Sequence, residues 1–392
     1  MRTYRLTGFF PSNKSDMNHG ILPTLYYISH ELVNLGVEEN VICLGNNLIR
    51  KYYEGINLHF VRQPYLINSI RKIHKLWKII PPDIVHGHGS DALPYALLKS
   101  ANIKNVPLIT HFHEVGKKVA GITVPPVRDL KGFLKMSLWY YVRLPLREKF
   151  ISSVSDKIIA VSRKVANDIA REYNVPKQKI EVVYNGVDTN LFFPKNKDRA
   201  KKLLKIQNKK LLLYVGALTF RKGINYLIEA YRILLKRYKG EMILLLIGGI
   251  PKWYGSEIYK TYLDKWSKDL VGKIIFKDAV PHYELPLYYN AADITILPSI
   301  EEPFGKVVLE SLACCTPVVV SQNAGVAEIL RHKETGFLVD PKDKYSLADS
   351  LYELLENVSL REKMGKKGYA FVTENYNWRR ISERILKIYR NI

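Results

Sequence analysis

Glu302 and Glu310 are two carboxylates separated by a Pro-Phe-Gly break within the stretch Ser299–Val320. Apolar runs flank this stretch on both sides, which predicts a strand, a loop, a helix and a second strand. The helix should begin near Phe304 and Gly305, where unpaired backbone N–H groups and the helix dipole favour an anion. A carboxylate beside an anion site suits a ligand that carries both phosphate and hydroxyl groups. An acidic first turn that only complements the helix dipole fits the spacing equally well.

The segment Val215–Gly223 offers a second candidate anion site. A strand is expected to end at Gly216, two adjacent cations follow at Arg221 and Lys222, and the next helix starts at Gly223. A guanidinium fork and an ammonium point charge together suit a diphosphate, whereas a solvated pair of cations is the alternative. The diphosphate interpretation gains weight because both loops are expected to leave the same edge of one sheet.

The composition describes a globular protein with an excess of positive charge. The chain has 392 residues, 47% hydrophobic and 25% charged, with a net charge of +23. Its length suits two domains, and its longest apolar run is too short to span a bilayer. Its amino terminus has no secretory apolar core, so we expect a cytoplasmic protein. Three cysteines without Cys-x-x-Cys spacing indicate neither a disulfide framework nor a zinc site.

Short β-branched runs alternate with longer helical patterns along the whole chain, which predicts parallel sheets. We expect an α/β protein of two Rossmann-like doubly wound parallel-sheet domains that face each other across a cleft. The expected boundaries are 1–192 for the first domain, 193–375 for the second domain, and 376–392 for a helix that packs back on the first domain. Neither half carries a Gly-x-Gly-x-x-Gly or Walker-type loop, which argues against dinucleotide oxidoreductases and P-loop enzymes.

Several motifs resemble glycosyltransferase family 4 in their order and spacing, over nearly the whole chain. They are the Glu-x₇-Glu stretch with Phe-Gly, Val-Gly-x-Leu followed by Lys-Gly, Leu-Leu-Ile-Gly-Gly, Tyr-Tyr-Asn-Ala-Ala-Asp, Ala-Cys-x-Thr-Pro-Val-Val, Thr-Gly-Phe-Leu-Val, Asp83–His88, Asp156–Ser162 and Val183–Asp188. The resemblance implies a retaining, nucleotide-sugar-dependent glycosyltransferase of the GT-B fold, of the hexosyltransferase type. In this family the favoured account of retention is front-side attack, in which the leaving phosphate takes the acceptor's proton.

The resemblance also implies roles for individual residues in the second half. Glu310 would bind the ribose hydroxyls of the donor, and Glu302 would face the donor sugar. Lys222 and Arg221 would neutralise the departing diphosphate, so that no metal is required. The absence of any Asp-x-Asp motif agrees with metal-free binding. Sugar hydroxyls and the distal phosphate would contact the backbone of Phe304, Gly305, Lys306 and Val307.

In the first half, the resemblance implies that His113 lies near the donor sugar, with His111 as the alternative. His19 and Gly20 correspond to a glycine-rich loop through which backbone approaches the diphosphate and the acceptor. Some positions depart from the family pattern. Ala217 stands where an arginine is common, and His19 replaces the first of two glycines. These changes suggest a phosphate contact that is either missing or moved to Arg221, and a more crowded acceptor side.

Two other functions compete with glycosyl transfer. A sugar-nucleotide epimerase or phosphorylase of the same fold would share the site, and a non-enzymatic basic protein that binds nucleic acid or membrane would explain the charge. We favour a nucleotide-sugar donor with a glycan or lipid-linked acceptor, and no specific nucleic acid. Basic and aromatic stretches between Arg62 and Lys78 and between Lys117 and Lys149 suggest peripheral contact with the anionic inner face of a membrane.

Overall fold

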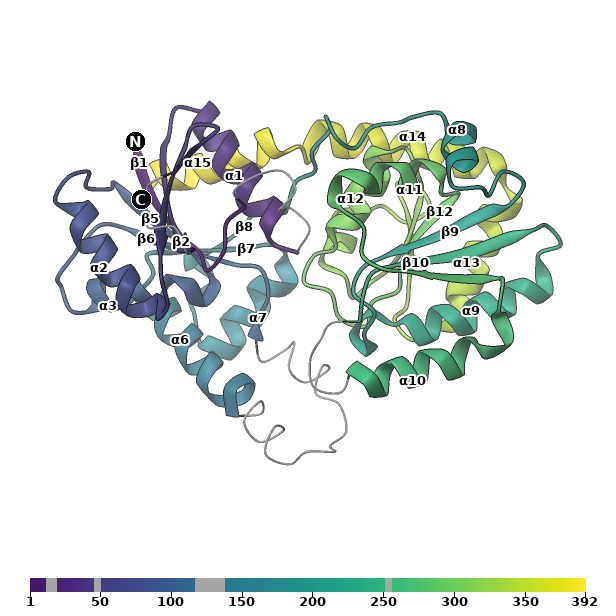
Figure 1. The fold of residues 1–392 in the computed structure, drawn as a ribbon, viewed down its shortest axis with the longest axis horizontal. Coiled ribbons are helices and arrows are strands. Elements are labelled where there is room, and N and C mark those ends of the chain that lie inside the picture. The colour runs from purple at the N-terminus through teal and green to yellow at the C-terminus, as the bar shows by residue number, and fades with distance from the viewer. Residues whose placement is uncertain (12–19, 46–50, 117–137, 251–255) are drawn as a thin grey trace. The chain divides into compact units, whose positions relative to one another are not determined.

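The computed structural model describes residues 1–11, 20–45, 51–116, 138–250 and 256–392, and Figure 1 shows the course of the chain. The chain forms two compact units. Unit 1 holds the described residues up to Asn185 together with Trp378–Ile392, and unit 2 holds Gly186–Asn377. The division after Asn185 lies a few residues before the expected boundary. How the two units face each other stays a prediction.

Unit 1 is built on an eight-stranded sheet with the order β3-β4-β2-β1-β5-β6-β7-β8. Every neighbouring pair is parallel except β3 with β4, which is antiparallel. The strands are β1 (Arg2–Leu6), β2 (Glu38–Leu44), β3 (Lys51–Tyr53), β4 (Ile56–Val61), β5 (Ile84–His88), β6 (Leu108–Phe112), β7 (Lys157–Ala160) and β8 (Ile180–Val182). The main helices are α1 (Leu22–Asn34), α2 (Tyr65–Trp77), α3 (Leu93–Ser100), α6 (Leu144–Val154), α7 (Arg163–Tyr173) and α15 (Trp378–Arg390).

Unit 2 is built on a six-stranded parallel sheet with the order β11-β10-β9-β12-β13-β14. The strands are β9 (Lys210–Val215), β10 (Met242–Ile247), β11 (Ile274–Lys277), β12 (Ile294–Leu297), β13 (Val318–Ser321) and β14 (Phe337–Val339). The helices are α8 (Lys197–Leu203), α9 (Ile224–Arg237), α10 (Ser256–Ser267), α11 (Leu285–Ala291), α12 (Lys306–Ala313), α13 (Lys344–Glu356) and α14 (Val358–Asn375).

The predicted fold class is confirmed, since both units are α/β with parallel sheets. Strands β10 and β12 are buried along their whole length, as expected for parallel strands covered by helices on both faces. The apolar runs of the sequence therefore located these strands well. The edge strand β3 was missed, because Lys51–Tyr53 has only three residues and no apolar run.

Two sets of helices cover the two faces of the sheet in unit 1. Ile73 of α2, Tyr95 of α3 and Ile151 of α6 pack in a core with the strand residues Tyr4 and Leu6. On the other face α1 packs over β2 and β4 through Leu25, and α15 lies against α1. Within unit 1, Trp378 stacks on Tyr27 with 5.7 Å between ring centroids. The last helix therefore helps to cover the sheet face opposite α2 and α3.

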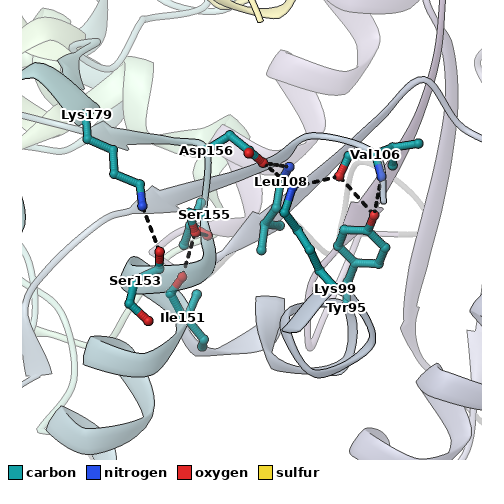
Figure 2. A network of polar contacts seen from close by, with 10 residues as sticks. Tyr95, Lys99, Val106, Leu108, Ile151, Ser153, Ser155, Asp156 and Lys179 are labelled. Carbon is teal, nitrogen blue, oxygen red and sulfur yellow. Dashed lines mark hydrogen bonds and ion pairs between the residues drawn. The ribbon is translucent and has the colours of Figure 1, made fainter. Parts of the chain in front are cut away.

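A polar network holds the amino ends of β6 and β7 together (Figure 2). Asp156 accepts hydrogen bonds from the Leu108 backbone N–H and from Lys99 Nζ, both at 2.6 Å. Tyr95 Oη accepts from the Val106 backbone N–H at 2.9 Å. These contacts fix where β6 begins, and the strand then carries its carboxyl end to the histidine that the sequence singled out.

No helix in the described part of the chain is both long and apolar enough to cross a membrane.

Candidate functional site

In unit 2, three loops that leave the carboxyl ends of β9, β12 and β13 are tied together by backbone hydrogen bonds. The Ile300 N–H donates to the Arg221 carbonyl oxygen at 2.9 Å. The Gly325 N–H donates to the Glu302 backbone carbonyl oxygen at 3.0 Å, and the Val326 N–H donates to the Phe304 backbone carbonyl oxygen at 2.8 Å. The structure therefore brings Arg221 and Lys222 to the same sheet edge as the Glu302 loop, as the sequence predicted.

Two glycines allow these loops to approach so closely. Gly223 precedes α9 with φ of +69°, and a Cβ atom there would lie 2.2 Å from the Pro298 carbonyl oxygen. Gly305 precedes α12 with φ of +104°, and a Cβ there would lie 2.6 Å from a methyl carbon of Leu297. Both positions require glycine for conformation and for space. Helix α12 begins where the sequence predicted.

Glu302 is buried, with 8% of its surface exposed, and is held by two side chains. Lys222 Nζ forms a close ion pair with Glu302 Oε2, and Ser299 Oγ donates to the same oxygen at 3.4 Å. Burial alone would raise the pKa of Glu302, but the charges of Lys222 and Arg221 outweigh burial and lower it. Glu302 is therefore ionised at neutral pH.

Glu310 lies within α12, is 7% exposed, and is held from two neighbouring elements. His282 Nε2 lies 3.1 Å from Glu310 Oε1, and Tyr289 Oη donates to Glu310 Oε2 at 2.8 Å. Burial opposes the charged form, but the hydrogen bond and charge of His282, the charge of Lys306 and the Tyr289 bond lower the pKa of Glu310. Each carboxylate oxygen keeps a further lone pair, because it accepts one of these bonds.

The remaining predicted residues of unit 2 lie around the same helix start. Phe304 is buried, whereas Gly305, Lys306 and Val307 are half-buried in the first turn of α12 or just before it. Burial lowers the pKa of the Lys306 ammonium to about 8, with Glu310 acting in the opposite direction. Arg221 Nε is buried and has no hydrogen-bond partner among the described residues. Together these groups give the sheet edge three cationic side chains beside the amino end of a helix.

In unit 1, His113 follows the last residue of β6, so it also stands at the carboxyl edge of its sheet. His111 and His113 stack with 4.4 Å between ring centroids, so their side chains lie on one face. His111 is buried and neither of its ring nitrogens has a partner in the described residues, whereas His113 is half-buried. This favours His113 over His111 as the histidine that a ligand can reach.

His113 belongs to a stack of four imidazoles that includes His86, His88 and His111. Arg5 lies beside the stack and donates from Nη1 to His88 Nε2 at 2.8 Å. Burial and the neighbouring positive groups lower the pKa values of His86, His88 and His111 well below the ordinary range. These three imidazoles are therefore neutral.

One ring nitrogen from each of His86, His88 and His111 lies within 4.8 Å of the others, a spacing that a metal centre would need. The three ring planes are nearly parallel, with 14° to 28° between them. An imidazole binds a metal in its own plane, so parallel rings cannot direct their lone pairs at one ion. The contact from Arg5 also occupies His88 Nε2. The arrangement does not fit a metal site.

Gly20 and His19 are the two remaining predicted site residues. Gly20 is exposed, with φ of +36°, just before α1. His19 lies outside the described residues, as do residues 117–137 of the second basic and aromatic stretch.

Sequence reasoning missed His282, Tyr289, Arg5 and His88 as parts of these sites. Tyr289 stands in the Tyr-Tyr-Asn-Ala-Ala-Asp motif, and His88 stands in Asp83–His88, so both carried a signal without an assigned role. Arg5 lies in β1, a strand that is buried from Thr3 to Leu6, and a charged residue that is fully buried needs a partner, so its place in a strand is a signal that could have been used. His282 had none.

Comparisons with known proteins indicate the family and the fold. The sequence pattern described as "Glycosyltransferase Family 4" matches residues 20–191, and that described as "Glycosyl transferases group 1" matches residues 195–371. An uncharacterized glycosyltransferase of Methanocaldococcus jannaschii is 26% identical over 386 residues, which cover 93% of this chain and 92% of that protein.

Among solved structures, sucrose-phosphate synthase from Thermosynechococcus elongatus has a TM-score of 0.80 at 19% identity, covering 100% of this chain and 98% of that one. The Anabaena protein HepE in complex with UDP-glucose has a TM-score of 0.73 at 18% identity, and both chains are covered completely. These two structures share the fold. The two sequence patterns together span most of the chain, and the chain belongs to the glycosyltransferases of the family 4 type.

Proposed function

We propose that this glycosyltransferase moves a sugar from a nucleoside diphosphate sugar to an acceptor hydroxyl, with retention of configuration and without a metal ion. The observation that carries the proposal is the carboxyl edge of the sheet in unit 2. There the pair of Lys222 with Glu302, the neighbouring Arg221 and the doubly held Glu310 surround the start of α12.

The nucleoside would bind through Glu310. His282 and Tyr289 hold the two carboxylate oxygens in place, and each oxygen keeps a lone pair that can accept a hydrogen bond from a ribose hydroxyl. Because the carboxylate is ionised, these bonds are charge-assisted and stronger than neutral ones. A fixed, ionised acceptor of this kind selects a ligand with two adjacent hydroxyl groups.

The diphosphate would bind to cations that are already positioned. Lys222 has three N–H donors and directs one at Glu302, so two can face an anion. Arg221 adds a guanidinium whose Nε has no partner in the described residues. Positive groups fixed where negative charge develops are typically worth about 10²–10³ in rate each. They would supply the stabilisation that a metal ion supplies elsewhere.

In the proposed reaction the bond between the anomeric carbon and the phosphate oxygen breaks, and the acceptor oxygen forms a bond to the same face of that carbon. The acceptor proton passes to the departing phosphate oxygen, so the products are the glycoside and the nucleoside diphosphate. Glu302 lies within reach of the Lys222 cation rather than standing alone, which suits a residue that orients the phosphate-binding lysine and the sugar. Positioning and electrostatics are then the main contributions to rate.

The donor base is proposed to be uracil, since the Anabaena neighbour was solved with UDP-glucose and shares the fold. The acceptor is proposed to be lipid-linked. In unit 1 the side chains Trp139, Tyr141, Val142 and Leu146 are exposed beside Arg143 on one continuous helical segment. Exposed aromatic and aliphatic side chains next to cations are typical of surfaces that contact anionic membranes.

A binding panel tests the donor proposal. The thermal midpoint of the protein is measured with UDP, GDP and ADP and with their sugars, each with Mg²⁺ and with EDTA. We expect a rise for one base that is equal in both conditions and lost in Glu310→Gln, while the exposed control Glu353→Gln keeps it. A rise that needs Mg²⁺ would contradict the metal-free mechanism. Sugar released or isomerised without an acceptor, or only with inorganic phosphate, would favour an epimerase or phosphorylase.

A vesicle assay tests the acceptor proposal. The protein is sedimented with vesicles that contain an anionic phospholipid, and with neutral vesicles, at low and at physiological salt. We expect binding to the anionic vesicles that weakens in Trp139→Ser and in Leu146→Ser. Equal recovery in the supernatant for all vesicles would remove the support for a membrane-borne acceptor.

A further inference from the structure

In unit 1 a continuous chain of hydrogen bonds runs from a buried carboxylate to His113. Glu39 accepts from Arg5 Nε and Nη2, both at 3.0 Å. Arg5 Nη1 donates to His88 Nε2 at 2.8 Å, and His88 Nδ1 lies 3.0 Å from His113 Nε2. These residues come from β2, β1, β5 and the end of β6, which are four neighbours in the sheet. The chain therefore crosses the sheet from its interior to its carboxyl edge.

Strand register places all of these side chains on one face. Arg5 pairs with Val41 of β2 and with His86 of β5, and His88 pairs with His111 of β6. Residues paired in register, or two apart on one strand, point to the same side of a sheet. Glu39, His88 and His113 are each two positions from one of these paired residues. The contact is thus built into the pairing of the strands and does not depend on a chance rotamer.

The direction of each hydrogen bond follows from which groups can accept. A guanidinium has only donors, so His88 Nε2 must offer its lone pair to Arg5. His88 is neutral, because burial and nearby positive groups lower its pKa well below the ordinary range. A neutral imidazole has one proton, which must then be on Nδ1, and Nδ1 faces His113. His88 therefore donates, and His113 accepts at Nε2.

We propose that Glu39, Arg5 and His88 act as positioning residues that fix His113 with its proton on Nδ1 and its Nε2 turned inward. The proposal rests on the proposed function in one respect, namely that His113 meets the donor sugar. In that role His113 offers an N–H to a sugar oxygen, and it is not the base that removes the acceptor's proton. Which nitrogen of a histidine carries the proton is set by the partner of the other nitrogen.

The other groups that face this chain support the same assignment. Arg5 Nη1 lies 3.5 Å from His86 Nδ1, and because a guanidinium only donates, this nitrogen is an acceptor. Tyr389 of α15 accepts from Arg5 Nη2 at 3.3 Å and lies 2.5 Å from His86 Nδ1, so its hydroxyl donates to His86. Ser29 of α1 donates to Glu39 at 3.4 Å. His111 stacks between the other rings without a hydrogen bond in the described residues. None of these contacts competes for His88 Nδ1 or reverses the direction of the hydrogen bonds from Arg5 to His113.

The test reads the tautomer directly. Protein labelled with ¹⁵N at histidine is examined by two-bond proton–nitrogen correlation spectra, which distinguish the protonated ring nitrogen from the bare one. We expect His113 to be bare at Nε2 and protonated at Nδ1 in the natural protein. His88→Phe keeps the ring stack but cannot donate, so His113 should shift towards the tautomer with the proton on Nε2. His88→Gln can accept from Arg5 and donate to His113, and should restore the original state.

The buried neighbour supplies a control, because His111→Phe changes the stack without touching the hydrogen-bonded chain. It should leave the His113 tautomer as it is. Wild-type His113 protonated at Nε2, or an unchanged tautomer in folded His88→Phe, would overturn the proposal. If His88→Phe does not fold, the wild-type spectrum still decides. Coordination of added Zn²⁺ by His88 Nε2 would displace Arg5 and would also contradict it.

Kinetics separate this proposal from the proposed function. Once a donor and acceptor are in hand, His88→Phe should lower kcat by about 10²-fold, the usual loss for one misdirected donor, with a smaller change in KM. His88→Gln should recover most of that loss. The tautomer measurement needs no substrate, so a failure of transfer activity would leave it standing. A correct tautomer with no kinetic effect would refute the role of His113 as a donor to the sugar.

Discussion

Replacing Lys222 by Met tests whether the Lys222–Glu302 pair is both a structural contact and a phosphate site. Methionine keeps most of the aliphatic stem and removes the charge. Only 14% of the Lys222 side chain and 10% of the Glu302 side chain are exposed, so water screens the pair weakly. Removing one partner of a buried ion pair typically costs about 3–5 kcal/mol, because the other charge is left buried. Because the pair is slightly exposed and Ser299 still donates to Glu302, we expect Lys222→Met to lower the free energy of unfolding by about 3 kcal/mol.

A double-mutant cycle separates stability from catalysis. Glu302→Gln removes the carboxylate charge at nearly constant shape, and the double variant Lys222→Met/Glu302→Gln removes both charges. The double variant should be more stable than Lys222→Met alone, so the two effects should deviate from additivity by well over the roughly 0.5 kcal/mol seen for independent sites. Transfer activity should instead stay about 10²–10³-fold below wild type in both, because the phosphate-binding cation is absent.

The assays are urea denaturation for the free energy of unfolding and release of nucleoside diphosphate for activity. The exposed pair Lys333–Glu353 serves as the control, since such surface pairs are typically worth about 0–1 kcal/mol. Lys222 and Arg221 lower the pKa of Glu302 against the effect of burial, so the stabilisation from the Lys222–Glu302 pair is fully present at neutral pH and is lost as pH falls through that lowered pKa. Additive effects, or full activity in Lys222→Met, would refute the assignment.

Three further predictions concern neighbouring charges. Glu310→Gln should weaken binding of the nucleoside diphosphate about 10-fold or more, since charge-assisted hydrogen bonds are worth about 1.5–3 kcal/mol, and calorimetric titration against Glu353→Gln measures it. Burial lowers the pKa of Lys306 to about 8, so its ammonium should lose its charge above that pH. Donor affinity should therefore fall above pH 8 in wild type but not in Lys306→Arg. A donor affinity that does not change with pH in wild type would contradict this prediction. Asp293→Asn should destabilise the protein by about 3 kcal/mol without changing donor affinity. Asp293 pairs with buried Lys201 at the amino ends of the strands, away from the site. Weakened nucleotide binding would contradict this and place the pair in the site.

The sequence predicted the course of unit 2 around its site because local patterns determine it. The apolar runs before and after Ser299–Val320 form β12 and β13, and Gly305 stands where α12 begins. The end of β9 at Gly216 and the start of α9 after Gly223 were also predicted correctly. The apolar run of β9 stops at Gly216, and a glycine with positive φ precedes each of the two helices, at Gly223 and Gly305. The loops of a parallel sheet then meet at one edge.

Contacts between distant parts of the chain could not be predicted in the same way. Glu310 and its partner His282 are separated by α11, β12 and the loop after β12, and nothing in their spacing brings them together. The sequence predicted Lys222 as a phosphate ligand and Glu302 as a sugar contact, but it did not predict that the two side chains pair with each other. Side-chain pairing depends on how loops fold over one another, which periodicity does not encode.

The two sites solve one physical problem in similar ways. A flexible lysine or a histidine with two tautomers is a poor catalytic group unless something fixes its orientation. In unit 2 the buried Glu302 fixes Lys222, and in unit 1 the buried Glu39 acts on His113 through Arg5 and His88. A buried carboxylate is costly to desolvate, so neither is well explained as a stabilising contact alone. Under the proposed function, Glu302 holds Lys222 for the diphosphate, and Glu39 holds His113 for the sugar through Arg5 and His88.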